Sequence, residues 1–287
     1  MYRLFCDSNC ELWHTMVEEL GISVISMPYT LGTETKGYDM GKEHDFKAFF
    51  DAMRNKAVPT TSALNEYDYI EYFEPVLAAG EDILYITFSH KLSGTFAFME
   101  KAIQTLREKY PARTIRAVDT KSISLGAGFI VYYAALQYKA GMGMDELVSY
   151  VEDLREHSAT YFAVDDLVYL KRGGRISGMA AAMGTLIGIK PIIAIMQDGS
   201  LQSVQKVKGS KKVISALVDY IVKKGENVTD WKIMILQADA SAAAEELSAK
   251  IREIYPEADI LIQPVGPVIG AHCGPGTLGV VFHASER

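Results

Sequence analysis

The residues best suited to hold a ligand lie in short polar segments, and one of them is the loop Ser89–Thr95. It follows the apolar run Asp82–Phe88, which is typical of a strand buried on both faces of a parallel sheet, and a helix is predicted directly after it. Ligands of such sheets bind at the carboxyl ends of the strands, where helix N-termini present free N–H groups. Ser93 and Thr95 are therefore candidates for binding an anion or for capping their own helix, and the two roles are compatible.

Three further segments combine hydroxyls, cations or glycines. Thr60-Thr61-Ser62 follows a proline, which favours extended backbone, and its hydroxyls either contact a ligand or cap the next helix. Lys171–Arg175 carries three cations around two glycines, a composition suited both to an anion site and to a solvated turn. Gly270–Gly276 contains His272, which is a candidate donor or general base, or a histidine with a structural partner.

A stand-alone enzyme is the main alternative to a binding role: a hydrolase that uses Ser93 with His272, or a kinase of the sugar-kinase type. A hydrolase needs an acid that orients the histidine and an oxyanion hole, and no third member is evident. The chain contains no G-x-S-x-G elbow and no P-loop, G-x-x-x-x-G-K-[ST]. Gly274–Gly279 matches G-x-G-x-x-G, but a strand rather than a helix is predicted after it. From the residues alone, the enzyme alternative therefore lacks a complete motif but stays open.

The elements that must position these segments alternate between strand and helix in the first half of the chain. This alternation predicts βαβ units and a mostly parallel sheet. The predicted strands are Arg3–Asp7, Ile22–Leu31, Asp82–Phe88 and Thr114–Asp119, and the predicted helices include Glu11–Leu20, Asp45–Met53, Tyr67–Leu77 and Met144–His157.

The pattern changes after about Ser158. The runs Ile192–Met196 and Leu201–Val207 flank Asp198-Gly199, which is typical of a hairpin turn. Helices are predicted at Ile214–Lys223 and Ala242–Ile254, and loops at Leu170–Gly178 and Gly266–Gly276. The predicted fold class is α/β, with an N-terminal mostly parallel α/β domain (1–158), a C-terminal α+β domain (159–287) and the ligand between them.

Composition excludes several classes of function. The 287 residues are 49% apolar and 23% charged with a net charge of −7, which is ordinary for a globular protein and unsuited to nucleic acid. The three cysteines are too few and too irregularly spaced for a disulfide framework, so reduced buried thiols are expected. Neither a signal peptide nor an apolar run long enough to span a bilayer is recognisable. We expect a soluble cytoplasmic protein.

Taken together and in this order, the segments resemble the DegV family of bacterial fatty-acid-binding proteins, and the resemblance covers nearly the whole chain. The motifs that carry it are Cys6-Asp7-Ser8, Thr61-Ser62, Ile83–Thr87 with Leu92–Thr95, Val118–Ser122, Val164–Leu167, Tyr169–Ser177, Ile189–Ile192 and Gly266–His272. Each motif is short, but the collinear set is specific.

This resemblance implies a lipid-binding protein that holds one long-chain fatty acid between two domains. It implies that the carboxylate is bound by Thr61 with Ser62 beside it, by Ser93 with Gly94, by His272 and by Arg172. Better-understood relatives are the lipid-carrying subunit of a fatty acid kinase. A separate ATP-binding subunit phosphorylates the bound carboxylate to an acyl phosphate for phospholipid synthesis. The absence of a P-loop agrees with such a carrier, whose membrane contact would be at most transient. The resemblance thus implies a chain that is not itself an enzyme and that needs no cofactor and no metal.

Three positions depart from the family pattern. Ala63-Leu64-Asn65 follow the Thr-Ser pair where relatives often have Gln-Pro-Ser, His90-Lys91 stand in place of Ser-Gly, and Cys273 replaces a common threonine. The proposed carboxylate contacts are unchanged by these departures. We also expect Lys171 and Arg175 to help dock the kinase partner near the mouth of the pocket.

Burial of an acyl chain favours binding by roughly 0.8 kcal/mol for each CH₂ group. The carboxylate is costly to bury unless it is hydrogen-bonded or paired, and hydroxyls, an imidazole and a guanidinium supply those contacts. Met179–Gly188 is rich in small and flexible residues, so it is either part of the tunnel wall or a tightly packed helix.

Overall fold

Four strands from the first half of the chain form a parallel sheet, in the order β2-β1-β6-β7. The computed structural model describes residues 2–175 and 188–287. The strands of this sheet are β1 (Tyr2–Asp7), β2 (Ser23–Ile25), β6 (Asp82–Thr87) and β7 (Ile115–Asp119). Leu84, Tyr85 and their neighbours on β6 are almost fully buried, as expected for a strand covered on both faces.

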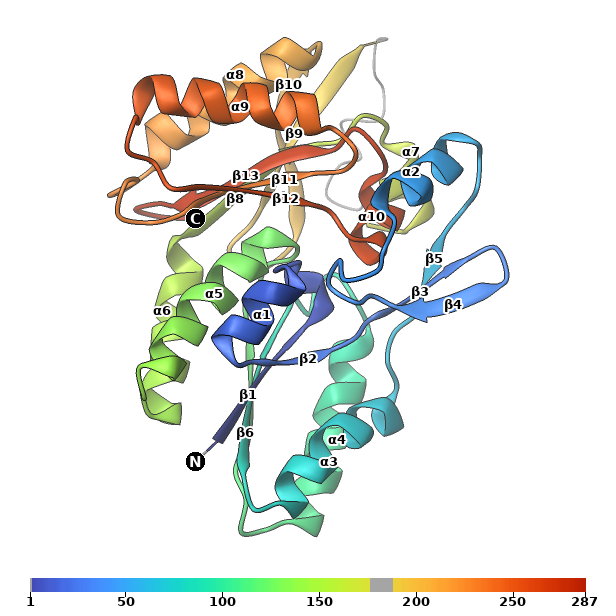
Figure 1. Cartoon of the computed structure of the whole chain (residues 1–287), viewed down its shortest axis with the longest axis vertical. Helices are drawn as coiled ribbons and strands as arrows, with labels where there is room; N and C mark the ends of the chain where they lie inside the picture. Colours follow the sequence, from blue (N-terminus) through green and yellow to red (C-terminus); the bar gives the residue numbers. More distant parts are fainter. Residues whose placement is uncertain (1, 176–187) are drawn as a thin grey trace.

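The helices of this half flank its parallel sheet (Figure 1). α3 and α4 pack together beside β6, whereas α5 contacts α1 and α6. The helices are α1 (His14–Leu20), α3 (Glu66–Ala78), α4 (Thr95–Lys109), α5 (Leu125–Lys139) and α6 (Met144–His157), and a short 3₁₀ turn, η1 (Ser8–Cys10), follows β1.

Between β2 and α3 the chain leaves the parallel sheet to form a small antiparallel sheet and a helix. The order β4-β3-β5 joins β3 (Pro28–Leu31), β4 (Glu34–Gly37) and the two-residue β5 (Thr60–Thr61). α2 (Phe46–Arg54) lies between β4 and β5 in the chain. Helix α10 (Pro267–Cys273) of the second half contacts α2, β3 and β5, so this excursion brings Thr61 next to the other half of the molecule.

The second half forms a six-stranded mixed sheet in the order β10-β9-β8-β13-β11-β12. β9 and β10 are the predicted hairpin across Asp198-Gly199, and β11 and β12 form a parallel pair. The strands are β8 (Ser158–Ala163), β9 (Ile189–Ile195), β10 (Leu201–Lys208), β11 (Ile233–Gln237), β12 (Ile260–Pro264) and β13 (Leu278–His283). The predicted mixed α/β fold, with a parallel sheet and a separate sheet with helices, is confirmed.

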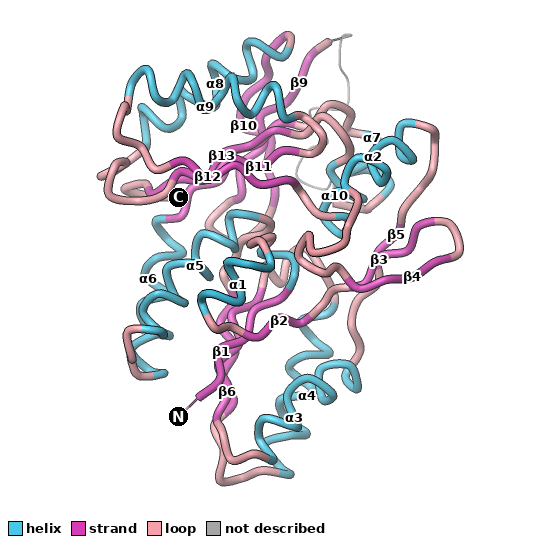
Figure 2. The backbone as a smooth tube through the Cα atoms, in the orientation of Figure 1, coloured by secondary structure: helices cyan, strands magenta, loops and turns pink. Residues whose placement is uncertain are grey.

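Two helices cover one face of the second sheet, and α5 covers the other (Figures 1 and 2). α8 (Ser210–Lys224) and α9 (Ser241–Ile254) share an apolar cluster with this sheet. α5 contacts β8, β11 and β13 as well as β1, and its residues from Leu125 to Val131 are buried. A helix enclosed on all sides needs an apolar surface all round, which explains the lack of polar residues in this stretch.

Two segments predicted as loops contain short helices. α7 (Val168–Arg172) begins before the predicted loop Leu170–Gly178 and ends inside it, and α10 (Pro267–Cys273) occupies most of the Gly/Pro-rich segment. Pro267 stands at the first turn of α10, a position where the missing N–H costs nothing. Asp166 accepts a hydrogen bond from the N–H of Val168 at 2.8 Å, which helps to start α7.

The apolar core is continuous across the two sheets. One cluster of buried side chains includes Leu4 and Ile86 from the first sheet and Phe162 and Leu236 from the second. β8 begins at Ser158, but the division into domains at residue 158 stays a prediction, because this cluster joins the two parts.

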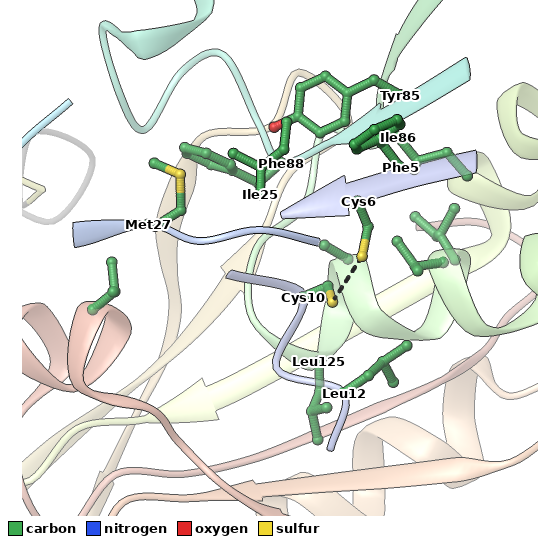
Figure 3. Close-up of a cluster of buried hydrophobic side chains, with 14 of the residues drawn as sticks. Phe5, Cys6, Cys10, Leu12, Ile25, Met27, Tyr85, Ile86, Phe88 and Leu125 are labelled. Carbon is green, nitrogen blue, oxygen red and sulfur yellow. Dashed lines mark hydrogen bonds between the residues drawn. The ribbon is translucent and has the colours of Figure 1, made fainter. Parts of the chain in front are cut away.

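The cysteines are buried and reduced, as predicted. Cys6, Cys10 and Cys273 are free thiols, and the sulfur atoms of Cys6 and Cys10 lie 3.8 Å apart (Figure 3). Met27 and Phe88 belong to the same cluster as this pair.

Candidate functional site

The candidate site begins with a hydrogen bond between two residues that lie 211 positions apart. The Oγ1 atom of Thr61 on β5 lies 2.8 Å from the Nε2 atom of His272 on α10. The contact exists because the antiparallel excursion packs against α10. It joins the hydroxyl segment to the histidine segment.

Gly173 permits the position of the His272 ring. A Cβ atom at residue 173 would stand 2.1 Å from the Nδ1 atom of His272, closer than any real carbon contact. The C-terminal end of α7 therefore approaches the ring because residue 173 has no side chain. His272 Nδ1 is itself buried, without a partner among the described residues.

Burial and a neighbouring cation keep His272 neutral. Desolvation, and secondly the charge of Arg175, lower the pKa of this imidazole from 6.5 to about 4. At neutral pH the ring is therefore an uncharged hydrogen-bonding group. A neutral imidazole offers one N–H donor and one acceptor nitrogen.

The main cavity, as we name it, is lined by Thr61, Ser62, Ser93, Gly94, Arg175 and His272 together with a larger number of apolar side chains. The two halves of the molecule both contribute to this apolar wall. The apolar residues of this wall include Phe88, Phe162, Ile195, Leu236, Val265 and Val268. Polar groups from four distant segments thus share a cavity whose wall is mostly apolar.

Ser93 and Gly94 reach the main cavity because they follow β6. The Oγ atom of Ser93 accepts a hydrogen bond from the N–H of Thr95, the first residue of α4, at 3.2 Å, and Ser93 also lines the cavity. The hydroxyl of Thr95 is used elsewhere, because it contacts the carbonyl of Leu64 and the hydroxyl of Tyr69. Ser93 lines the main cavity, whereas Thr95 does not.

The structure places the two arginines of the basic segment differently. Arg175 lines the main cavity, and its Nε atom donates to the carbonyl of Leu92 at 3.0 Å. Arg172 is exposed on α7, and its guanidinium carbon lies 5.9 Å from the ring centroid of Tyr169. Arg172 lines instead an outer cavity, which it shares with Thr60, Thr61, Tyr169, Gly173, Arg175 and His272.

The burial of Arg175 has an electrostatic consequence. Desolvation lowers the pKa of this guanidinium below its ordinary value, although it stays charged at neutral pH. Arg175 is half-buried, and a partly desolvated cation without a carboxylate partner is unfavourable. No ion pair of Arg175 is present within the described residues. An incoming carboxylate would supply that partner.

Lys171 lies apart from these groups. It is exposed on α7 and lines neither the main nor the outer cavity. Its expected contact with a partner protein stays a prediction.

The segment Met179–Gly188, predicted as a tunnel wall or a packed helix, lies outside the described residues except for Gly188.

A buried carboxyl group links two of the helices around the site. Glu11 accepts hydrogen bonds from the N–H of Gly266, at 2.6 Å, and from the hydroxyl of Ser124. It thereby links the N-termini of α10 and α5. Desolvation raises the pKa of Glu11 to about 8, so the side chain is mostly protonated at neutral pH. Glu11 therefore helps to position the helix that carries His272.

A model of the DegV family, described as "Uncharacterised protein, DegV family", matches residues 1–285. This chain belongs to the DegV family. It is 40% identical over 281 residues to a DegV domain-containing protein of Clostridium perfringens, with 98% of this chain and 97% of that protein covered.

Solved structures of other DegV proteins have the same fold. The structure of a DegV family protein from Thermus thermophilus, described by its fatty acid binding, matches with a TM-score of 0.88 and 28% identity over 99% of both chains. The fatty acid kinase B3 protein of Streptococcus pneumoniae, solved with linoleic acid, matches with a TM-score of 0.84 and covers 99% of this chain and 100% of its own. Because its identity is 22%, that second likeness concerns the fold.

The sequence reasoning missed several polar residues of this DegV cavity. Asn9, Ser124, Thr160 and Thr277 also line it. Asn9 follows β1 and Ser124 follows β7, so both lie at the same carboxyl edge as Ser93. The rule that selected Ser93 could have found these two. Thr160 lies within β8, where no local signal marks it.

The DegV chain lacks two other kinds of site within residues 2–175 and 188–287. No group of three or more His, Cys, Asp and Glu side chains there could hold a metal ion. No helix in those ranges is long and apolar enough to cross a membrane.

Proposed function

We propose that this protein binds one long-chain fatty acid in the main cavity, with the carboxylate at Thr61, Ser93, His272 and Arg175. The observation that carries the proposal is the composition of one cavity wall. Hydroxyl, imidazole and guanidinium groups lie together on a wall whose other members are mostly apolar. A fatty acid has the same division between an anionic head and an apolar tail.

The hydrogen-bond geometry supports an anion at this end of the cavity. If His272 Nε2 donates its proton to Thr61 Oγ1, the threonine hydroxyl is left to donate its own proton to a carboxylate oxygen. Arg175 adds a charge-assisted contact. These donors offset the cost of removing the carboxylate from water. The Thermus thermophilus relative, described by its fatty acid binding, supports the same ligand class.

We further propose that the bound carboxylate is presented to a separate ATP-binding kinase subunit. An oxygen of the carboxylate would form a bond to the terminal phosphorus of ATP, while the bond from that phosphorus to ADP breaks. The products would be an acyl phosphate and ADP. In this arrangement the present chain supplies the substrate and its orientation, and the partner supplies ATP.

The competing hydrolase hypothesis lacks its catalytic geometry. Ser93 Oγ is bonded to the N–H of Thr95, and His272 Nε2 is bonded to Thr61. No hydrogen bond joins Ser93 to His272, and no described carboxylate bonds to the imidazole. A serine hydrolase needs both contacts.

The decisive experiment is native mass spectrometry of the protein as purified from its host, followed by extraction of the ligand. We expect a mass shift equal to one fatty acid and its recovery in the extract. The delipidated protein should then regain one equivalent of palmitate. Absence of both results would reject fatty acid binding.

The kinase step is tested separately with an ATP-binding fatty acid kinase subunit and radiolabelled ATP. We expect phosphate transfer to palmitate only when this chain is present. Alanine at Thr61, Ser93 or His272 should slow the transfer while the far-ultraviolet dichroism is retained. Unchanged turnover in all three variants would reject the proposed carboxylate site.

A further inference from the structure

A second, polar cavity adjoins the head-group end of the main cavity. It is lined by His90, Lys91, Gly174 and Ser200, in addition to five residues that it shares with the main cavity. The shared residues are Leu92, Ser93, Gly94, Arg175 and Leu201. The two cavities therefore adjoin along these shared residues.

His90 is held in a fixed orientation at this polar cavity. Its Nδ1 atom lies 2.5 Å from the Oδ2 atom of Asp119, and its backbone N–H also points to that oxygen at 3.4 Å. Phe96 packs against the ring with centroids 5.9 Å apart. Because Nδ1 is occupied, Nε2 is the nitrogen left for a ligand, and no described residue bonds to it.

Two cations and a helix end face the same space. Lys91 is exposed and forms no direct ion pair with a described residue, and Arg175 has its guanidinium on the shared wall. Gly94 is the N-cap of the 15-residue α4 and offers no side-chain cap. The positive end of the α4 dipole therefore adds to the cationic side chains.

The nearby acids do not line this cavity, but each is hydrogen-bonded to one of its residues. Hydrogen bonds from Ser200, helped by the charge of Lys91, lower the pKa of Asp198. Asp119 accepts from His90 and from the N–H of Lys121. Asp198 accepts from the N–H and hydroxyl of Ser200, at 2.9 and 2.6 Å. The positively charged side chains that line the cavity are Lys91 and Arg175, with the imidazole of His90 beside them.

We propose that this polar cavity binds the phosphoryl group of an acyl phosphate, an inference that rests on the proposed function. In an acyl phosphate the phosphorus is one oxygen atom away from the carbonyl carbon. A carbonyl at Ser93 and Arg175 in the main cavity would thus place the phosphoryl oxygens beside the residues that the two cavities share. His90 and Lys91 then contact a group that a free fatty acid does not have.

The role of His90 and Lys91 is therefore to distinguish product from substrate. A fatty acid ends in one carboxylate and makes its polar contacts within the main cavity. The acyl phosphate adds a dianion with three acceptor oxygens, for which cationic donors are the preferred partners. These two residues should favour retention of the product without affecting the binding of the fatty acid.

The test compares two ligands that share an acyl chain. Palmitate represents the substrate, and 2-oxoheptadecylphosphonate represents palmitoyl phosphate, because a methylene replaces the bridging oxygen and prevents hydrolysis. The variant is the double substitution His90→Ser with Lys91→Ala. The control is Lys109→Ala at the opposite end of α4, where the lysine pairs with Glu74. Affinities are measured by displacement of a fluorescent fatty acid.

We expect the double variant to bind the phosphonate roughly tenfold more weakly than the unmodified protein, the loss typical of removing charge-assisted contacts at a partly exposed site. Palmitate affinity should be unchanged, and the control should behave as the unmodified protein with both ligands. Added salt should weaken phosphonate binding more than palmitate binding.

Equal phosphonate affinity in the double variant and the unmodified protein would overturn the inference and leave fatty acid binding intact. A parallel loss for palmitate and phosphonate would also overturn it, because the two residues would then belong to the carboxylate site. Failure of the unmodified protein to bind either ligand would instead reject the proposed function itself.

Discussion

The Nε2 atom of His272 lies 2.8 Å from the Oγ1 atom of Thr61, and the imidazole is neutral because burial lowers its pKa to about 4. A neutral ring can fix the direction of the threonine hydroxyl without adding a second cation beside Arg175. This pairing makes Thr61 a directed donor at the end of the main cavity.

The first prediction concerns that donor. Thr61→Val keeps the shape of the side chain and removes the hydroxyl, whereas Thr61→Ser keeps the hydroxyl and removes a methyl group. A hydrogen bond to a charged group contributes about 1.5–3 kcal/mol, so the valine variant should bind palmitate at least about tenfold more weakly. The serine variant should stay close to the unmodified protein in a calorimetric titration. Equal affinities in all three proteins would remove Thr61 from the carboxylate site.

The second prediction separates the two arginines. Arg175 lines the main cavity, whereas Arg172 is exposed and lies over Tyr169. Arg175→Met should therefore weaken palmitate binding roughly tenfold. Arg172→Met should change it by less than about threefold, as is usual for an exposed charge. If Arg172→Met weakened palmitate binding more than Arg175→Met did, the carboxylate would instead be bound by Arg172, the residue that the family resemblance indicated.

The third prediction uses the close approach of Gly173 to His272. A Cβ atom at residue 173 would displace the imidazole and break its contact with Thr61. Gly173→Ala should thus reduce palmitate affinity. Gly143→Ala is the matched control, because a Cβ there meets only the Glu146 side chain, at 3.4 Å. If both alanine variants bind palmitate like the unmodified protein, the ring position is not important for binding.

The fourth prediction concerns acid sensitivity. His272 has an ordinary pKa of 6.5, lowered to about 4 in the folded protein, so between these values the unfolded chain binds more protons than the folded one. Stability due to this group therefore falls as pH decreases from about 6.5 to about 4. His272→Gln should flatten the pH dependence of the free energy of unfolding in that window, measured by urea denaturation of the ligand-free protein. An unchanged slope would contradict the burial argument.

How far the sequence predicted this site depended on the distance between its parts. Ser93 followed from a local pattern, an apolar strand before a polar loop and a helix, and the structure places it at the expected edge of the sheet. Thr61 and His272 are 211 positions apart, and no local pattern joins them. They were grouped only through the family resemblance.

The choice between Arg172 and Arg175 depended on backbone geometry that composition does not reveal. α7 ends at Arg172, and Gly174 has a φ of 72°, a left-handed conformation that suits glycine. This turn directs the chain so that Arg175 reaches Leu92 and the cavity wall.

The Gly/Pro-rich segment Gly266–Gly276 is predicted as a loop, but in the structure Pro267 begins a helix and Gly270 fits closely against Phe50.

The fifth prediction concerns Glu11, whose carboxyl joins the N-termini of α5 and α10. Its pKa is raised from 4.5 to about 8 by burial, so between these values the folded protein keeps a proton that the unfolded chain releases. The contribution of this group to stability therefore decreases as pH rises through that range. Glu11→Gln preserves an acceptor for Gly266 and cannot ionise, so the variant should lose this slope. Its stability relative to the unmodified protein should be greater at pH 9 than at pH 6. The exposed Glu100→Gln serves as the control, and the same slope in all three proteins by urea denaturation would show that Glu11 does not titrate as its burial requires.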